Sequence, residues 1–140
     1  MLKLKNMKIR IFAFVLFVSA FAGCDLLEED ITAPDGSLPY ITVSSPSENA
    51  VYSKGQTFNL KSEISDKDKI NQLDVRVTKI NTDSGSQPVW GFTKQPMRNP
   101  VIIDTAFTVS SLPAGDYILT LNTVDGRTNV GTKEIKFSIK

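Results

Sequence analysis

Apolar and polar residues alternate with a period of two along most of the chain after residue 40. Leu73, Val75 and Val77 form one such run, and Ile135 and Phe137 belong to another. A period of two places successive side chains on opposite faces of an extended strand, so one face can be buried. Segments rich in Pro, Gly, Asp and Asn separate the runs. The pattern predicts strands at 40–44, 56–65, 70–80, 87–93, 100–109, 116–124 and 132–139.

About seven half-buried strands, with no helical stripe among them, predict an all-β fold in which two sheets pack face to face. The expected architecture is an immunoglobulin/fibronectin-like β-sandwich. The hexapeptide Leu112-Pro-Ala-Gly-Asp-Tyr117 resembles the tyrosine corner of such sandwiches. In that interpretation Leu112 fills the core, Gly115 allows the bend, and the Tyr117 hydroxyl bonds back to the backbone. A plain turn before a strand is the alternative.

The first 23 residues have a different pattern, in which a basic segment precedes an apolar one. Residues 11–22 form a run of twelve apolar or small residues. As a helix this run would be roughly 18 Å long, whereas a bilayer core is about 30 Å thick. The run is therefore too short for a membrane span and has the length of a secretory signal. The basic residues before it are Lys3, Lys5, Lys8 and Arg10.

The only cysteine, Cys24, lies two residues beyond the apolar run. Phe21, Ala22 and Gly23 precede it and resemble a lipobox, with Phe21 standing where leucine is usual. Lipidation requires a thiolate, because diacylglycerol is attached as a thioether. We therefore expect signal peptidase to recognise Phe21, Ala22 and Gly23, and Cys24 to become a lipidated N-terminus. An ordinary signal peptide with a coincidental cysteine is the alternative.

Removal of residues 1–23 changes the charge of the protein. The segment holds four of the 16 basic residues and none of the 15 acidic ones, so the remainder carries a formal charge of −3. This balance argues against nucleic-acid binding. With Cys24 acylated, no thiol is left for a disulfide, so the core must supply the stability. The chain contains no histidine, which removes the commonest general base and transition-metal ligand.

Residues 24–39 are acidic and contain Pro34, Gly36 and Pro39, which predicts a flexible tether between the lipid and a domain at residues 40–140. The simplest interpretation is a solvated spacer. An alternative is that its acidic residues form an export signal, because they resemble those that send some Bacteroidota lipoproteins to the cell surface. These residues are Asp25, Glu28, Glu29 and Asp30.

Several motifs of the predicted domain resemble those of the small immunoglobulin-like lipoproteins of Bacteroidota, most of which are domains of unknown function. Among them are Pro39-x-Ile-x-Val, Gly55-x-x-Phe58 and Val124-Asp-Gly-x-x-Asn129, together with the tyrosine-corner segment. The resemblance covers residues 38–140. It implies a β-sandwich attached by lipid to the bacterial outer membrane. Many members have a histidine near the tyrosine-corner bend, where this chain has Asp116-Tyr117.

Two groups of residues are candidate binding sites. Asp66, Asp68 and Asp125 lie in loops that an immunoglobulin-like sandwich places at the same end, where they could hold calcium; capping of turns is the competing interpretation. Trp90 and Phe92 share one face of a predicted strand and could form a platform for a sugar ring. Packing of Trp90 against the core or a sheet edge is the competing interpretation.

No nucleophile–histidine pair or phosphate-binding glycine loop is present in the sequence, so we expect a protein without enzymatic activity. We predict no cofactor beyond the covalent lipid on Cys24, with calcium as the one candidate ion. The expected function is a binding or adhesion module of the bacterial outer membrane or cell surface, with an unknown protein or glycan as partner. The alternatives are a structural or accessory subunit of an envelope assembly and a glycan-binding accessory of polysaccharide uptake.

Overall fold

The computed structural model describes residues 33–81, 85–108 and 112–140. Cys24, the residues before it and the acidic residues 25–30 lie outside the described residues. Within the described part, no helix is long and apolar enough to cross a membrane.

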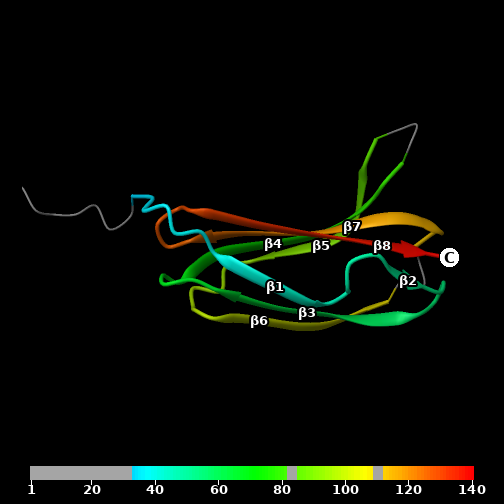
Figure 1. Ribbon diagram of the computed structural model, residues 1–140, viewed down its shortest axis with the longest axis horizontal. Coiled ribbons are helices and arrows are strands. Elements are labelled where there is room, and N and C mark those ends of the chain that lie inside the picture. Colours follow the sequence, from blue (N-terminus) through cyan, green and yellow to red (C-terminus); the bar gives the residue numbers. More distant parts are fainter. Residues whose placement is uncertain (1–32, 82–84, 109–111) are drawn as a thin grey trace, which may run out of the picture. The chain divides into compact units, whose positions relative to one another are not determined.

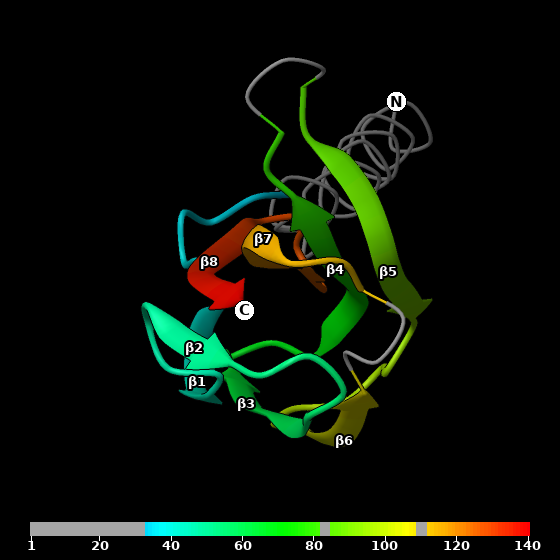
Figure 2. The same cartoon turned by 90° about the vertical axis from the view of Figure 1, so that its right-hand side faces the viewer.

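The described residues form two β-sheets that pack face to face (Figures 1 and 2). The first sheet has the strand order β1-β3-β6, and the second has the order β2-β8-β7-β4-β5. All strand pairs are antiparallel except β2 with β8, which is parallel. The strands are β1 (Tyr40–Ser45), β2 (Ala50–Tyr52), β3 (Thr57–Ser65), β4 (Ile70–Lys79), β5 (Gln87–Lys94), β6 (Val101–Thr108), β7 (Gly115–Asp125) and β8 (Val130–Ile139).

This arrangement is an immunoglobulin-like β-sandwich and confirms the predicted fold class. Each of the seven predicted strands is present, with ends that agree to within two residues. The sequence pattern missed β2. That strand has three residues, Ala50, Val51 and Tyr52, and all of them are apolar although Val51 is 56% exposed, so the sequence shows no alternation of polar and apolar residues there. It is held by pairing with the last residues of β8, which are distant in sequence.

The core lies between the two sheets and is built from the inward residues of both. Leu60 and Ile64 come from β3, and Val75 and Leu121 come from β4 and β7. Ser62 occupies an inward position on β3, and its hydroxyl donates a hydrogen bond of 2.8 Å to the Thr42 carbonyl. All members of this buried cluster lie between residues 41 and 139, so this part of the chain carries its own core.

The structure confirms the tyrosine corner. The Tyr117 ring is fully buried, and its hydroxyl donates a hydrogen bond of 2.5 Å to the Pro113 carbonyl. Leu112 is buried in the core, as expected. Gly115 has a φ of 147°, a conformation that residues with a Cβ rarely adopt. The Phe137 ring stacks on Tyr117 with centroids 5.4 Å apart, and burial raises the pKa of the Tyr117 hydroxyl.

Candidate functional site

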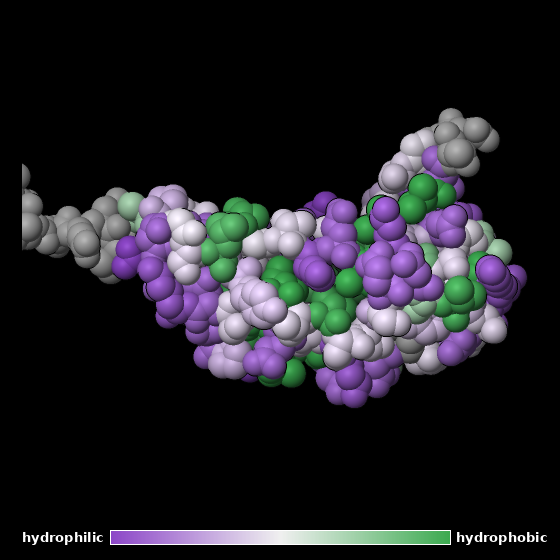
Figure 3. Space-filling model, viewed as in Figure 1, coloured by the Kyte–Doolittle hydropathy of each residue, from purple (hydrophilic) through white to green (hydrophobic). Residues whose placement is uncertain are grey.

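The sandwich brings the three candidate calcium ligands together at one end. Asp66 and Asp68 lie in the connection between β3 and β4, and Asp125 ends β7. One carboxylate oxygen from each lies within 4.8 Å of the others. Hydrophilic residues predominate at this end of the surface in Figure 3. We call Asp66, Asp68 and Asp125 the acidic cluster.

Asp125 is fully buried and organises the turn between β7 and β8. Its Oδ1 accepts hydrogen bonds of 2.8 Å from the backbone N–H groups of Arg127 and Asn129. Its Oδ2 accepts a third bond of 2.8 Å from the Asn129 side-chain amide. A buried carboxylate needs such donors, because loss of hydration disfavours its charge. Both oxygens of Asp125 are therefore committed to the turn.

The other two aspartates are partly exposed. Asp66 Oδ1 accepts a hydrogen bond of 2.9 Å from the Asp68 N–H, which caps the β3–β4 turn. Asp66 Oδ2 is buried and has no hydrogen-bond partner among the described residues. Arg127 Nε lies 3.3 Å from Asp68 Oδ2, so that carboxylate has a cationic neighbour.

A fourth aspartate, Asp35, joins this network from the segment before β1. It forms an ion pair with Lys67, its Oδ2 lies 3.6 Å from Arg127 Nε, and its Oδ1 accepts a 3.0 Å bond from the Asn129 amide. The bond from Lys67, followed by one from the Ser37 N–H, lowers the pKa of Asp35 from 3.8 to about 2. Residues 33–39, the part of the expected tether that the structure describes, are thus bound to the sandwich.

The chemistry of the acidic cluster fits turn capping more fully than cation binding. Calcium takes six to eight oxygen ligands, and three carboxylates could supply a share of them. However, both oxygens of Asp125 already accept hydrogen bonds, and Arg127 and Lys67 place positive charge beside the cluster. Asp66 Oδ2 and Asp68 Oδ2 are both buried, and neither has a hydrogen-bond partner among the described residues.

Trp90 and Phe92 lie on the face of β5 that is turned toward the three-stranded sheet. Both rings are half-buried and pack against the core. The Trp90 centroid lies 4.6 Å from that of Phe107 on β6 and 5.5 Å from that of Phe92. The exposed part of these rings therefore lies where the edges of the two sheets meet. Tyr52 on β2 packs edge-on against Phe137, with the ring centroids 5.9 Å apart.

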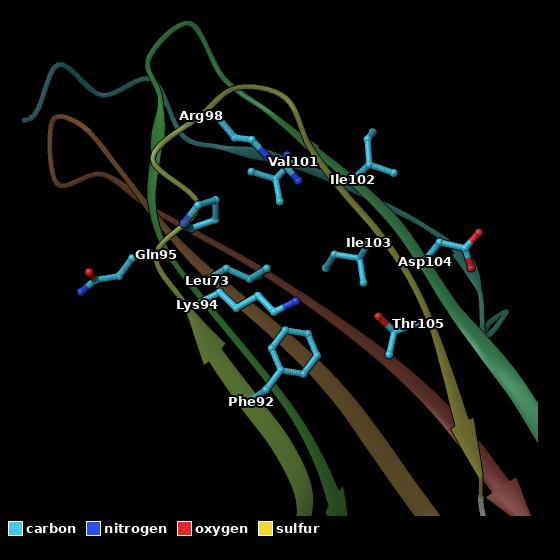
Figure 4. A pocket seen from close by; sticks show the side chains of 11 residues that line it. Leu73, Phe92, Lys94, Gln95, Arg98, Val101, Ile102, Ile103, Asp104 and Thr105 are labelled. Atoms are coloured by element: carbon cyan, nitrogen blue, oxygen red, sulfur yellow. The ribbon is translucent and has the colours of Figure 1, made fainter.

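A groove of about 470 Å³ lies between β5 and β6, the last strands of their sheets (Figure 4). Its lining is apolar at Leu73, Phe92, Val101 and Ile103, and basic at Lys94 and Arg98. Sequence reasoning did not find this groove, because strand periodicity predicts which face is buried but not which edges lie side by side. We call this feature the β5–β6 groove.

No protein-family model matches the chain, and no curated protein matches it. Solved structures do. A Niemann-Pick type C2 protein from the Japanese carpenter ant aligns with 11% identity and a TM-score of 0.51, over 74% of this chain and 92% of that one. Wild-type OgpA from Akkermansia muciniphila aligns with 13% identity and a TM-score of 0.51, over 76% of this chain and 29% of OgpA. At such identities the likeness concerns the fold alone: the chain is similar to other two-sheet β-sandwiches.

Proposed function

We propose that the protein is a lipid-anchored, non-catalytic binding module of the bacterial outer membrane. Cys24 carries the lipid, and the sandwich presents a binding surface to a partner. The order of a basic segment, a short apolar run and the only cysteine supports the anchor. The absence of histidine from the chain and the hydrogen bonds of the buried Asp125 support a role without catalysis.

The observation that carries this proposal is the lipobox-like sequence that ends at Cys24, and residues 33–39 attach to one end of the sandwich. Asp35 binds Lys67 and Arg127 there, so the chain that leads from Cys24 joins the body beside the acidic cluster. The segment from Cys24 to residue 33 spans at most about 30 Å when fully extended. This length sets an upper limit on the distance between the lipidated cysteine and the start of the described residues. Confinement near the membrane raises the effective concentration of a weak binder for partners that are held there.

Metabolic labelling tests the anchor. Cells that express the full chain are fed an alkynyl fatty acid, and the protein is followed by its label and by membrane fractionation. We expect label and membrane association in the wild type, and loss of both in Cys24→Ser. The control is Cys24→Ser combined with Ser37→Cys, which keeps one cysteine but moves it out of the lipobox. This variant should remain unlabelled, because acylation depends on the residues before the thiol.

Mass spectrometry of the native protein can contradict the lipidation of Cys24. A free, unmodified thiol at Cys24, or a labelled Ser37→Cys variant, would contradict a lipobox at residues 21–24. The folded body would then remain a β-sandwich without the proposed location.

A further inference from the structure

β6 is an edge strand of the three-stranded sheet and pairs with β3 on one side only. Its residues, Val101–Thr108, pair with β3 in unbroken register and include neither proline nor glycine. Most of them are β-branched or aromatic, which favours a regular strand. The backbone N–H and C=O groups that Val101–Thr105 direct away from β3 have no strand partner among the described residues, so they can accept another strand.

The other edge strands carry features that oppose such pairing. β1 has a register shift between Val43 and Ser45, and β2 has only three residues. β5 contains Pro88, which lacks an N–H, and its pairing with β4 is irregular beside that proline. Prolines, bulges and short lengths are the usual means by which proteins protect sheet edges. β6 has none of these features, so it is the described edge at which addition of a strand is least hindered.

The open space beside β6 borders the edge of the strand rather than one of its faces. The β5–β6 groove, of about 470 Å³, is lined by consecutive residues of β6, 101–105. In Figure 4, Val101 and Ile103 lie on one side of the β6 ribbon, and Ile102 and Asp104 lie on the other. Because Val101 and Ile103 are almost wholly buried, a ligand here would meet the backbone of the strand rather than an apolar floor. A strand added to β6 would lie about 4.8 Å from it and would therefore occupy this groove.

The segment between β5 and β6, which forms the wall at one end of the groove, is firmly held. The Met97 N–H donates to the Ile70 carbonyl, and the Ile70 N–H donates to the Arg98 carbonyl, both at 2.9 Å. The Asn99 side chain accepts a 3.1 Å bond from the Asp66 N–H and donates to the Asp66 carbonyl. Because these bonds hold the beginning of β6 in place, the edge does not have to be ordered by its partner.

Two cations face the position that an added strand would take. Lys94 pairs with the buried Leu73, so its side chain shares the face of β5 that is turned toward the three-stranded sheet. Lys94 and Arg98 extend toward the space between the strands in Figure 4, and neither belongs to an ion pair among the described residues. Asp104 also lines the groove, but its carboxylate lies 3.4 Å from Lys61 Nζ. Alternate side chains of an added strand would point toward the two cations, because successive side chains of a strand point to opposite faces.

From this combination we propose that β6 binds an extended peptide segment of a partner protein, which adds to the three-stranded sheet as a fourth strand and carries carboxylates at alternate positions. Backbone hydrogen bonds along residues 101–105 supply the affinity, and carboxylates opposite Lys94 and Arg98 select the sequence. This inference rests on the proposed binding role, for which it names the class of partner. It does not depend on acylation of Cys24, so the two proposals can fail separately.

Peptide binding to residues 25–140 provides the test. This soluble form contains the whole core and lacks Cys24, so its result is independent of the anchor. The probe is a fluorescein-labelled peptide of four Glu-Val repeats, and its binding is followed by fluorescence anisotropy. We expect saturable binding, and slower hydrogen exchange of backbone amides in residues 101–105 when the peptide is bound. The amides of β1, at the other edge of the same sheet, should exchange at an unchanged rate.

Two control peptides separate strand pairing from charge. A peptide of four Glu-Pro repeats has the same charge but lacks every second N–H, so it should show no saturable binding. A peptide of four Gln-Val repeats can pair as a strand but has no carboxylate. It should bind about tenfold more weakly than the Glu-Val peptide, which is about 1.4 kcal/mol.

Two protein variants separate the charge of the groove from the charge of the protein. Lys94→Gln/Arg98→Gln should weaken binding of the Glu-Val peptide about tenfold and leave binding of the Gln-Val peptide unchanged. Lys133→Gln/Lys136→Gln makes the same change in net charge at exposed positions of β8 and should bind both peptides as the wild type does. All four altered residues are exposed, so both variants should melt within a few degrees of the wild type.

Any of four results would overturn the proposal. The first is no saturable binding of the Glu-Val peptide, or equal binding of the Glu-Pro peptide, because strand pairing would then not be what binds. The second is binding without slower exchange in residues 101–105. The third is equal affinity of the Glu-Val peptide for the wild type and Lys94→Gln/Arg98→Gln. The fourth is dimerisation of residues 25–140 in analytical ultracentrifugation with the amides of 101–105 protected before peptide is added, which would assign this edge to a second copy of the chain.

Discussion

Replacement of Asp125 by alanine tests whether the acidic cluster is a structural network. Asp125 is fully buried and accepts three hydrogen bonds of 2.8 Å, two from the backbone of the β7–β8 turn and one from the Asn129 amide. A hydrogen bond to a charged group contributes about 1.5–3 kcal/mol, and bonds that share one carboxylate are not additive. We therefore expect Asp125→Ala to lower the free energy of unfolding by about 3 kcal/mol. That is a large share of the roughly 5–15 kcal/mol typical of a folded domain.

The assay is urea unfolding of residues 25–140 at neutral pH, followed by Trp90 fluorescence and by circular dichroism. Asp116→Ala is the matched control, because Asp116 lies on the same strand with an exposed side chain. Its effect should stay within about 0.5 kcal/mol. Asp125→Asn keeps one acceptor and places an amide N–H opposite the Asn129 amide, so its loss should be intermediate. A loss below about 1 kcal/mol in Asp125→Ala would refute the reasoning, since the three donors would then have found other partners.

Three further predictions follow from the described contacts. Tyr117→Phe removes the bond to the Pro113 carbonyl and should cost about 1 kcal/mol in urea unfolding; an unchanged midpoint would show that the tyrosine corner adds no stability. Since the pKa of Asp35 is lowered from 3.8 to about 2, its carboxylate stabilises the fold above about pH 4, and this contribution is lost as the pH falls toward 2. The melting temperature should therefore depend less on pH between 4 and 2 in Asp35→Asn than in the wild type. The same pH dependence in both proteins would contradict the ion pair. Excess calcium should leave the melting temperature unchanged, because the carboxylates of Asp66 and Asp125 already accept hydrogen bonds within their turns. A rise in melting temperature that disappears in Asp66→Asn would establish a cation site instead.

The fold could be predicted from the sequence because its signals are local. Alternation of side chains located seven of the eight strands. The tyrosine corner was equally visible, because Tyr117 and the carbonyl that it binds are four residues apart. Strand periodicity and turn chemistry act within about ten residues, so a single sequence is enough to read them.

The parts that could not be predicted depend on contacts between distant residues. Tyr52 lies on the short strand β2, which pairs with the end of β8. No pattern in the neighbouring sequence predicts that pairing. Asp35 lies 94 positions from Asn129, so the acidic segment looked like a spacer in the sequence. The face shared by Trp90 and Phe92 was visible from their spacing, but its direction toward β6 follows from the packing of the two sheets.

Asp66 connects the wall of the β5–β6 groove to the acidic cluster. Its backbone is bonded to Asn99 in the wall of the β5–β6 groove, and its carboxylate belongs to the acidic cluster beside which Asp35 binds the sandwich. The groove wall and the attachment of the tether are therefore at the same end of the body.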